Sequence, residues 1–325
     1  MTRSPATGLP VVVTLDLEPD LRVIGRDGAT SWSGVDPTIA TIERWRADLP
    51  GAAVHWAWRC DPAIAEAHGD PGWALARWRG QIVEATTRGD AVGVHPHFWR
   101  WSDPLGTFVV DAADDAWKAE CIERSVTTFT RVVGRPPQTC QIGDGYFDAA
   151  ILGALVEHRI GIDLTLEPGA ARRERHVHTE LTTGTIPDRA RVPRVPFHPK
   201  PRNPLRAGRR GASPLWEIPL TTSTEPLVVD GVVVDPPGTV ALLGLAPSRF
   251  RHAVTTGLAA SVAAGAPYLN VMGRSDAGAD AGLTEHTVRN LEWLRTGMRG
   301  LAEPWGEVRF VTPDRLLDLL GLTRA

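Results

Sequence analysis

Residues 11–20 read VVVTLDLEPD, a run of β-branched residues that ends in a cluster of acids. Similar short apolar runs recur along the chain, and a stretch with helical periodicity follows most of them. Alternating strands and helices at short spacing predict parallel pairing through right-handed crossovers, and therefore an α/β fold. Roughly seven to nine such units favour a closed barrel, in which functional groups lie at the carboxyl ends of the strands. The residues after each run are thus the candidates for chemistry.

Strands are expected at residues 11–17, 52–58, 91–95, 139–142, 160–164, 215–220, 239–243, 268–272 and 308–311. Helices are expected at residues 36–48, 71–87, 122–133, 151–156, 248–264, 284–299 and 312–320. Asp36-Pro37 and Thr312-Pro313 are typical helix starts, and Gly134 is a typical helix end. A stretch rich in proline and arginine, about residues 168–213, interrupts this rhythm. We therefore expect one domain over residues 1–325 with a single insertion.

The composition excludes several classes of protein. The 325 residues are 42% hydrophobic and 22% charged, with a net charge of −3, so neither wholesale disorder nor a nucleic-acid partner is expected. The three cysteines, Cys60, Cys121 and Cys140, form no CxxC motif and indicate a reducing compartment. Residues 226–246, the most apolar stretch, are interrupted by aspartates and prolines, so no transmembrane segment is expected. The N-terminus lacks the apolar core of a secretory signal, which predicts a cytoplasmic protein.

Two pairs of polar side chains follow expected strands. Asp16 and Glu18 are two residues apart, so both leave the first strand on the same side. His95 and His97 have the same spacing after the third strand. Alone, the acids also fit a solvated loop and the histidines also fit ordinary polar residues with satisfied hydrogen bonds. In one barrel, however, the four side chains would converge at its mouth. Two nitrogen ligands, one oxygen ligand and an open position are typical of catalytic zinc, and the remaining acid is then available as a base.

These segments resemble the motifs of the polysaccharide deacetylase family, also called the NodB-homology or carbohydrate esterase family 4 group. VTLDLEPD stands in the place of the first motif, in the Asp-x-Glu form of a divergent branch, and VGVHPHFW in the place of the histidine motif. PPQTCQIGDGYFD, LWEIPLTTS and PYLNVMGRSD resemble the third, fourth and fifth motifs, in the family's order over about residues 10–320. The resemblance implies a distorted (β/α)7-8 barrel.

The resemblance also assigns roles to residues. It implies that Asp16 is the catalytic base and that Glu18, His95 and His97 hold a divalent metal ion, with Zn²⁺ expected first. The family's second histidine ligand usually follows the first by four residues, where this chain has Trp99. His97 takes that place in the His-x-His branch.

Two further departures concern the catalytic groups. Gln141 stands where the family often has an arginine that tethers the base, and the fifth motif lacks the histidine that normally serves as the acid. Asn270, Arg274 and Asp276 are found there instead. Asp276 is the candidate acid if burial raises its pKa, and Arg274 is the candidate to stabilise charge on the substrate.

Four more residues are candidate substrate contacts. Arg59 and Asp61 follow the second strand, and the alternative for them is a surface ion pair. Asp144 lies in the glycine-flanked turn after the fourth strand, where the alternative is an ordinary turn residue. Trp99 lies beside the proposed ligands, where an indole can stack on a sugar ring.

Three functions are compatible with these patterns. The first is a metal-dependent N-deacylase that removes an acetyl or formyl group from an amino-sugar conjugate. Six arginines and one lysine between Arg191 and Arg210 form either a solvated loop or a lid for an anionic group, which suggests a nucleotide-linked, lipid-phosphate-linked or phosphorylated sugar. The second is a glycoside hydrolase that uses Asp16 and Glu18, and the third is an inactive sugar-binding homologue.

Overall fold

The computed structural model describes residues 8–20, 24, 30–173, 182–209 and 211–323. Its centre is an eight-stranded parallel sheet in the order β11-β7-β6-β3-β2-β1-β14, with β15 paired to the first half of β1. The strands are β1 (Leu9–Leu17), β2 (His55–Trp58), β3 (Ala91–Val94), β6 (Thr139–Cys140), β7 (Ile162–Asp163), β11 (Trp216–Glu217), β14 (Leu269–Arg274) and β15 (Val308–Phe310).

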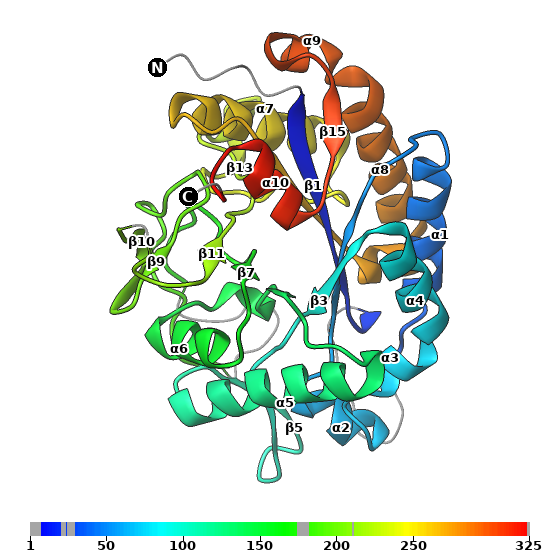
Figure 1. Ribbon diagram of the computed structural model, residues 1–325, viewed down its shortest axis with the longest axis vertical. Coiled ribbons are helices and arrows are strands. Elements are labelled where there is room, and N and C mark those ends of the chain that lie inside the picture. Colours follow the sequence, from blue (N-terminus) through cyan, green and yellow to red (C-terminus); the bar gives the residue numbers. More distant parts are fainter. Residues whose placement is uncertain (1–7, 21–23, 25–29, 174–181, 210, 324–325) are drawn as a thin grey trace.

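The helices surround this sheet as an outer layer (Figure 1). They are α1 (Val35–Arg46), α2 (Pro62–His68), α3 (Trp73–Arg77), α4 (Arg79–Arg88), α5 (Asp115–Val133), α6 (Ala149–Glu157), α7 (Pro247–Ala263), α8 (Ala281–Glu292), α9 (Arg299–Ala302) and α10 (Pro313–Leu319). No helix in the described residues is both long enough and apolar enough to span a bilayer.

The sheet curls into a distorted barrel whose gap between β11 and β14 is bridged by the segment after β11. The Thr221 amide donates to the Asn270 carbonyl at 2.8 Å, and the Asn270 side-chain amide donates to the Ile218 carbonyl at 3.1 Å. Leu242 and Met272 add an isolated parallel bridge to β14. The predicted (β/α)7-8 barrel is therefore confirmed, with irregular backbone in place of one regular ladder.

Strand β1 shows how the sequence divides the two faces of the barrel wall. Its odd-numbered residues, such as Val13 and Leu17, join the main apolar core under the helices. Of its even-numbered residues, Thr14 donates to Asn270 at 3.2 Å, and Asp16 accepts from Gln141 at 3.4 Å. Because side chains alternate along a strand, Glu18 continues the inward, polar row.

Several element boundaries differ from the sequence prediction. The predicted helix 71–87 is two helices, because Trp78 leaves the helical region and its indole N–H donates to Asp36 at 2.6 Å. Asp36 is therefore not the N-cap of α1, which starts one residue earlier, at Val35. The predicted strand 239–243 forms only isolated bridges. By contrast, Thr312 precedes α10 and Gly134 ends α5 as predicted.

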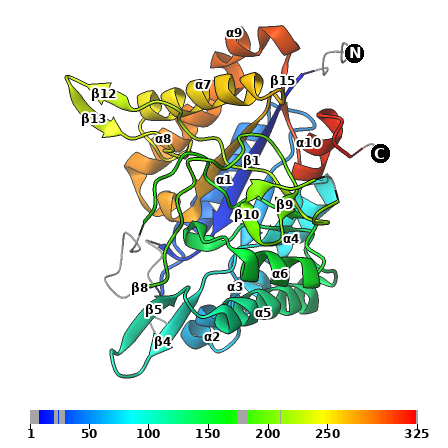
Figure 2. The same cartoon turned by 90° about the vertical axis from the view of Figure 1, so that its left-hand side faces the viewer.

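Small hairpins were not predicted from the apolar runs. Strands β4 (Trp99–Ser102) and β5 (Thr107–Asp111) follow the HPH segment, and β12 (Leu227–Val229) and β13 (Val232–Asp235) project beside α7 (Figure 2). Within the predicted insertion, β8 (Thr182–Thr183) pairs with β5, and β9 (Pro199–Lys200) pairs with β10 (Asn203–Ala207).

Replacing Asn270 with leucine should weaken the bridge across the barrel gap. The substitution leaves the Ile218 carbonyl and the Thr14 hydroxyl buried without their present partner, and each such group costs about 1–3 kcal/mol. We expect the free energy of unfolding in urea to fall by about 2–4 kcal/mol. The matched control, Asn203→Leu at an exposed position of β10, should change it by less than about 0.5 kcal/mol. Equal effects of the two substitutions would contradict this role of Asn270.

Candidate metal centre

The site is built by the register of four neighbouring parallel strands. The Arg59 amide donates to the Leu17 carbonyl, the His95 amide to Trp58, and the Gln141 amide to Val94, at 3.1, 2.9 and 3.0 Å. These bonds place the residues that follow β1, β2, β3 and β6 in one row at the carboxyl end of the barrel. The row is Glu18, Arg59, His95 and Gln141.

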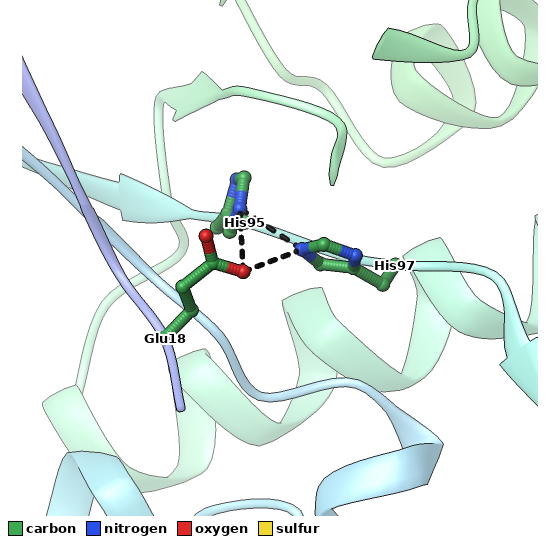
Figure 3. Close-up of side chains that lie close together, drawn as sticks. All are labelled: Glu18, His95 and His97. Atoms are coloured by element: carbon green, nitrogen blue, oxygen red, sulfur yellow. Dashed lines mark hydrogen bonds and ion pairs between the residues drawn. The ribbon is translucent and has the colours of Figure 1, made fainter. Parts of the chain in front are cut away.

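Glu18, His95 and His97 point toward one another from two strand ends (Figure 3). His97 Nε2 lies 3.2 Å from Glu18 Oε2 and 3.0 Å from His95 Nε2, and His95 Nε2 lies 3.9 Å from Glu18 Oε2. All three side chains are at least 97% buried. The predicted ligand atoms are therefore close enough to share one ion.

The hydrogen bonds behind the two rings orient their free nitrogens. His95 Nδ1 lies 2.8 Å from the Gln141 carbonyl, and His97 Nδ1 lies 3.1 Å from Asp144 Oδ2. Both partners only accept, so each Nδ1 carries a proton, and Nε2 is the nitrogen whose lone pair each ring, once neutral, turns toward Glu18. Such partners are typical of metal-binding histidines, since they fix the tautomer and the orientation of the ring.

The donor set fits a small divalent cation. Tetrahedral coordination with bonds of about 2.1 Å places ligand atoms about 3.4 Å apart, close to the three distances here. Without an ion, a proton on His97 supplies the positive charge that faces Glu18. Burial disfavours charge on His97, but Asp144 and Glu18 outweigh it and raise its pKa to about 9. Burial likewise disfavours charge on Glu18, but His97 outweighs it and lowers the pKa of Glu18 to about 2.

Asp16 lies beside the three ligands without joining them. Its Oδ1 lies 3.8 Å from His95 Nδ1, and its Oδ2 accepts from the Gln141 amide at 3.4 Å. Burial, and then the charge of Glu18, raise the pKa of Asp16 well above its usual value. Asp16 is thus a buried carboxyl next to the proposed ligands, and within the described residues its side chain accepts one long hydrogen bond, from a neutral amide.

Comparisons with known proteins bear on the fold. One similar solved structure is a Parabacteroides distasonis protein assigned as a glycoside hydrolase/deacetylase. The alignment covers 97% of this chain and 72% of the Parabacteroides chain, at 13% identity and a TM-score of 0.59. The alignment with the PuuE allantoinase covers 99% of this chain and 93% of the allantoinase chain, at 13% identity and a TM-score of 0.56. The chain has the fold of the deacetylase-type barrels. No protein-family model matches the sequence, and no curated protein matches it significantly.

Within this deacetylase-type barrel, Arg274 and Asp276 lie on the β14 side of the ligand set. Arg274 Nε lies 3.8 Å from Glu18 Oε1 and 3.1 Å from Asp276 Oδ1, and its Nη2 donates to Asp276 Oδ2. Burial raises the pKa of Asp276, although Arg274 acts in the opposite direction. The predicted acid is therefore held by the guanidinium group through both of its oxygens.

The other predicted contacts lie behind or beside the ligands. Asp61 is fully buried and accepts from Arg59 Nε at 2.8 Å and from the His97 amide at 3.1 Å. Asp144 supports His97, and the indole of Trp99 donates to Asp144 at 3.0 Å. Trp99 is only 6% exposed, so its described contacts are those of a supporting residue.

Ser275 is a site residue that sequence reasoning missed. The Glu18 amide donates to Ser275 Oγ at 2.9 Å, and Ser275 Oγ donates back to the Glu18 carbonyl at 2.8 Å. This exchange ties the ligand-bearing backbone after β1 to the segment after β14. The two residues are 257 positions apart, and no local pattern marks their pairing.

Part of the predicted arginine-rich insertion packs into the body of the protein. Arg189 is fully buried and donates to Glu167 at 2.8 Å, and Arg194 donates to the Thr222 carbonyl at 2.9 Å. Arg202 and Arg209 remain exposed. Position 210 and residues 174–181 lie outside the described residues.

Substituting Gly143 with alanine should displace His97. A Cβ atom at position 143 would lie 2.3 Å from the His97 ring, whereas one at Gly153 in α6 would meet nothing within 4 Å. We expect Gly143→Ala to weaken Zn²⁺ binding about 10- to 100-fold, as loss of a supporting contact does, and Gly153→Ala to leave it unchanged. Competition with a chromophoric chelator measures both affinities. Equal affinities would contradict the assigned ligand His97.

Metal affinity should also rise with pH. His97 has a pKa of about 9 in the ion-free protein, so one proton must leave before its Nε2 can bind. His95, with a pKa lowered to about 4 chiefly by burial, is already neutral near pH 7. Between pH 6 and 8 the apparent Zn²⁺ affinity should therefore increase about tenfold per pH unit. Using Asp16→Asn as the background removes the titration of Asp16, and a pH-independent affinity would contradict the prediction.

Proposed function

We propose that this protein is a metal-dependent hydrolase that removes an acetyl or formyl group from the nitrogen of an amino-sugar conjugate. The observation that supports the proposal best is the buried set Glu18, His95 and His97, with the separate carboxyl of Asp16 beside it. Two imidazoles and one carboxylate are a typical ligand set of catalytic zinc, so Zn²⁺ is the proposed ion. Two of the solved structures that share this fold carry the names glycoside hydrolase/deacetylase and allantoinase, which is consistent with the proposal.

The residues of the chain suit amide hydrolysis. Zinc held by this set would supply the Lewis acidity that makes water nucleophilic near neutral pH. The Gln141 carbonyl and Asp144 hold protons on the two Nδ1 atoms and so keep both Nε2 atoms free for the ion. Asp16 takes the proton of the attacking water, a role that its raised pKa favours.

The leaving amine must receive a proton. Both oxygens of Asp276 are bonded to Arg274, so releasing a proton from Asp276 would require that pair to rearrange. We therefore assign the delivery to Asp16, which returns the proton it has taken, and assign to Asp276 the role of holding Arg274. Arg274 in turn lies 3.8 Å from the ligand Glu18 and places positive charge next to the site.

The substrate class rests on charge. The exposed Arg202 and Arg209 of the insertion suit a phosphate, so we propose a nucleotide-linked, lipid-phosphate-linked or phosphorylated amino sugar. A glycoside hydrolase is less well supported. Its two carboxyls flank the scissile bond at about 5 Å or more, whereas Glu18 is turned toward the histidines and away from such a role.

Two substitutions separate the base from the ligands. Asp16→Asn should retain Zn²⁺ but lower turnover about 10²- to 10⁴-fold, the usual contribution of a positioned base. Glu18→Gln should lose both metal and turnover, and Asp230→Asn at the exposed turn of the β12–β13 hairpin should change neither. Metal content and release of acetate or formate are measured on N-acetylated and N-formylated amino sugars, with and without phosphate.

Three results would overturn the proposal. Full activity of Asp16→Asn would exclude its role as the base. Turnover that survives complete removal of metal would favour the glycoside hydrolase. The third result is that wild type binds zinc and an acylated sugar but releases no acetate or formate, even at high enzyme concentration. The protein would then be the inactive sugar-binding homologue.

A further inference from the structure

Arg59 is a buried guanidinium group with an unused end. Its side chain is 0% exposed, and it follows β2 in the same row as Glu18 and His95. Nε donates to Asp61 at 2.8 Å, whereas Nη1 and Nη2 have no hydrogen-bond partner among the described residues. Buried polar groups almost always have a partner, and a buried charge with unfilled donors is costly. The unfilled donors therefore indicate a bound group that this end of Arg59 receives.

The position of Arg59 narrows the identity of that group. Nη1 lies 3.9 Å from Glu18 Oε2, which is beyond hydrogen-bond length, and Oε2 is the atom that faces the two histidines. A ligand atom bonded to Nη1 at about 2.9 Å is therefore next to any ion held by this oxygen. This is where the reacting acyl group must lie, and not the distant end of a conjugate.

Neighbouring contacts hold Arg59 in this pose. Asp61 Oδ2 accepts both Arg59 Nε and the His97 amide, and Asp61 Oδ1 accepts the Ala63 amide at the start of α2. One carboxylate thus fixes the guanidinium group relative to the backbone of a proposed ligand. The Trp99 ring lies 5.7 Å from the centre of the guanidinium group.

The second guanidinium group near Glu18 differs in this respect. Arg274 Nε and Nη2 both donate to Asp276, so these two donors of Arg274 already have a carboxylate partner. Of the two arginines within 4 Å of Glu18, Arg59 is the one whose terminal nitrogens lack such a carboxylate in the described chain.

We infer that Arg59 is a catalytic residue that binds the acyl oxygen of the substrate and then the carboxylate product. The inference rests on the proposed function. As water adds to the acyl carbon, the carbonyl electron pair moves to the oxygen, and Arg59 donates to the resulting oxyanion. When the C–N bond breaks, the amine leaves with a proton, and the carboxylate product keeps one oxygen on Arg59. Donors placed at a developing oxyanion are among the most effective catalytic groups.

Product binding tests this role without requiring turnover. The protein is loaded with Co²⁺, and the change of its visible spectrum with added acetate or formate gives the affinity for each anion. Arg59→Met should bind Co²⁺ within threefold of wild type, but acetate about 10- to 100-fold more weakly, because a charge-assisted hydrogen bond is lost. Arg79→Met, which removes an exposed arginine of α4, is the matched control and should bind acetate as wild type does.

The outcomes separate this inference from the proposed function. If the wild type takes up no Co²⁺, the metal centre and the inference both fail. If Co²⁺ binds but Arg59→Met binds acetate with wild-type affinity, or wild type binds no acetate, the inference fails and the metal centre stands. If Arg59→Met does not fold, Arg59→Lys decides. Arg59→Lys keeps the positive charge but lacks the paired N–H donors of the guanidinium group. It should bind acetate at least about fivefold more weakly than wild type, so wild-type affinity would overturn the inference.

Discussion

The register of the parallel strands is the constraint on which the rest of the site depends. Leu17, Trp58 and Val94 accept main-chain hydrogen bonds from the first residues beyond the neighbouring strands, so those residues lie at one level. A shift of β3 by one residue relative to β2 would turn His95 away from Glu18, because side chains alternate along a strand. The site is therefore placed by backbone bonds and only then refined by side chains.

Electrostatics explains why so many charges can be buried together. The carboxylate of Glu18 has guanidinium nitrogens 3.9 and 3.8 Å away, from Arg59 and Arg274, and an imidazole nitrogen at 3.2 Å. Each guanidinium group has its own carboxylate partner, Asp61 or Asp276. Positive and negative groups thus alternate around Glu18, which offsets much of the cost of removing them from water. A cation bound here would replace the proton of His97 that faces Glu18, and would supply the positive charge in its place.

Much of this arrangement follows from local patterns, and the rest does not. Asp16, Glu18, His95 and His97 were predictable because each follows a short apolar run with a spacing of two. The bonds from Ser275 to Glu18 and from Trp99 to Asp144 depend on contacts between distant segments, so no local signal marks them. The break of the helix at Trp78 has the same origin, since its indole bonds to Asp36, 42 positions away. Local sequence therefore specifies the proposed ligands better than it specifies the residues that support them.

The spacing of the two histidines shows how the support adapts to the ligands. In the family that the sequence resembles, the second histidine usually follows the first by four residues, the position of Trp99 here. The rings of His95 and His97 stand nearly perpendicular, at 86°, with centres 4.7 Å apart, and His97 occupies space that only a glycine at position 143 leaves open. Trp99 then bonds to Asp144, which bonds to His97. Position 99 thus still contributes to the centre, but through the residue that orients the ligand.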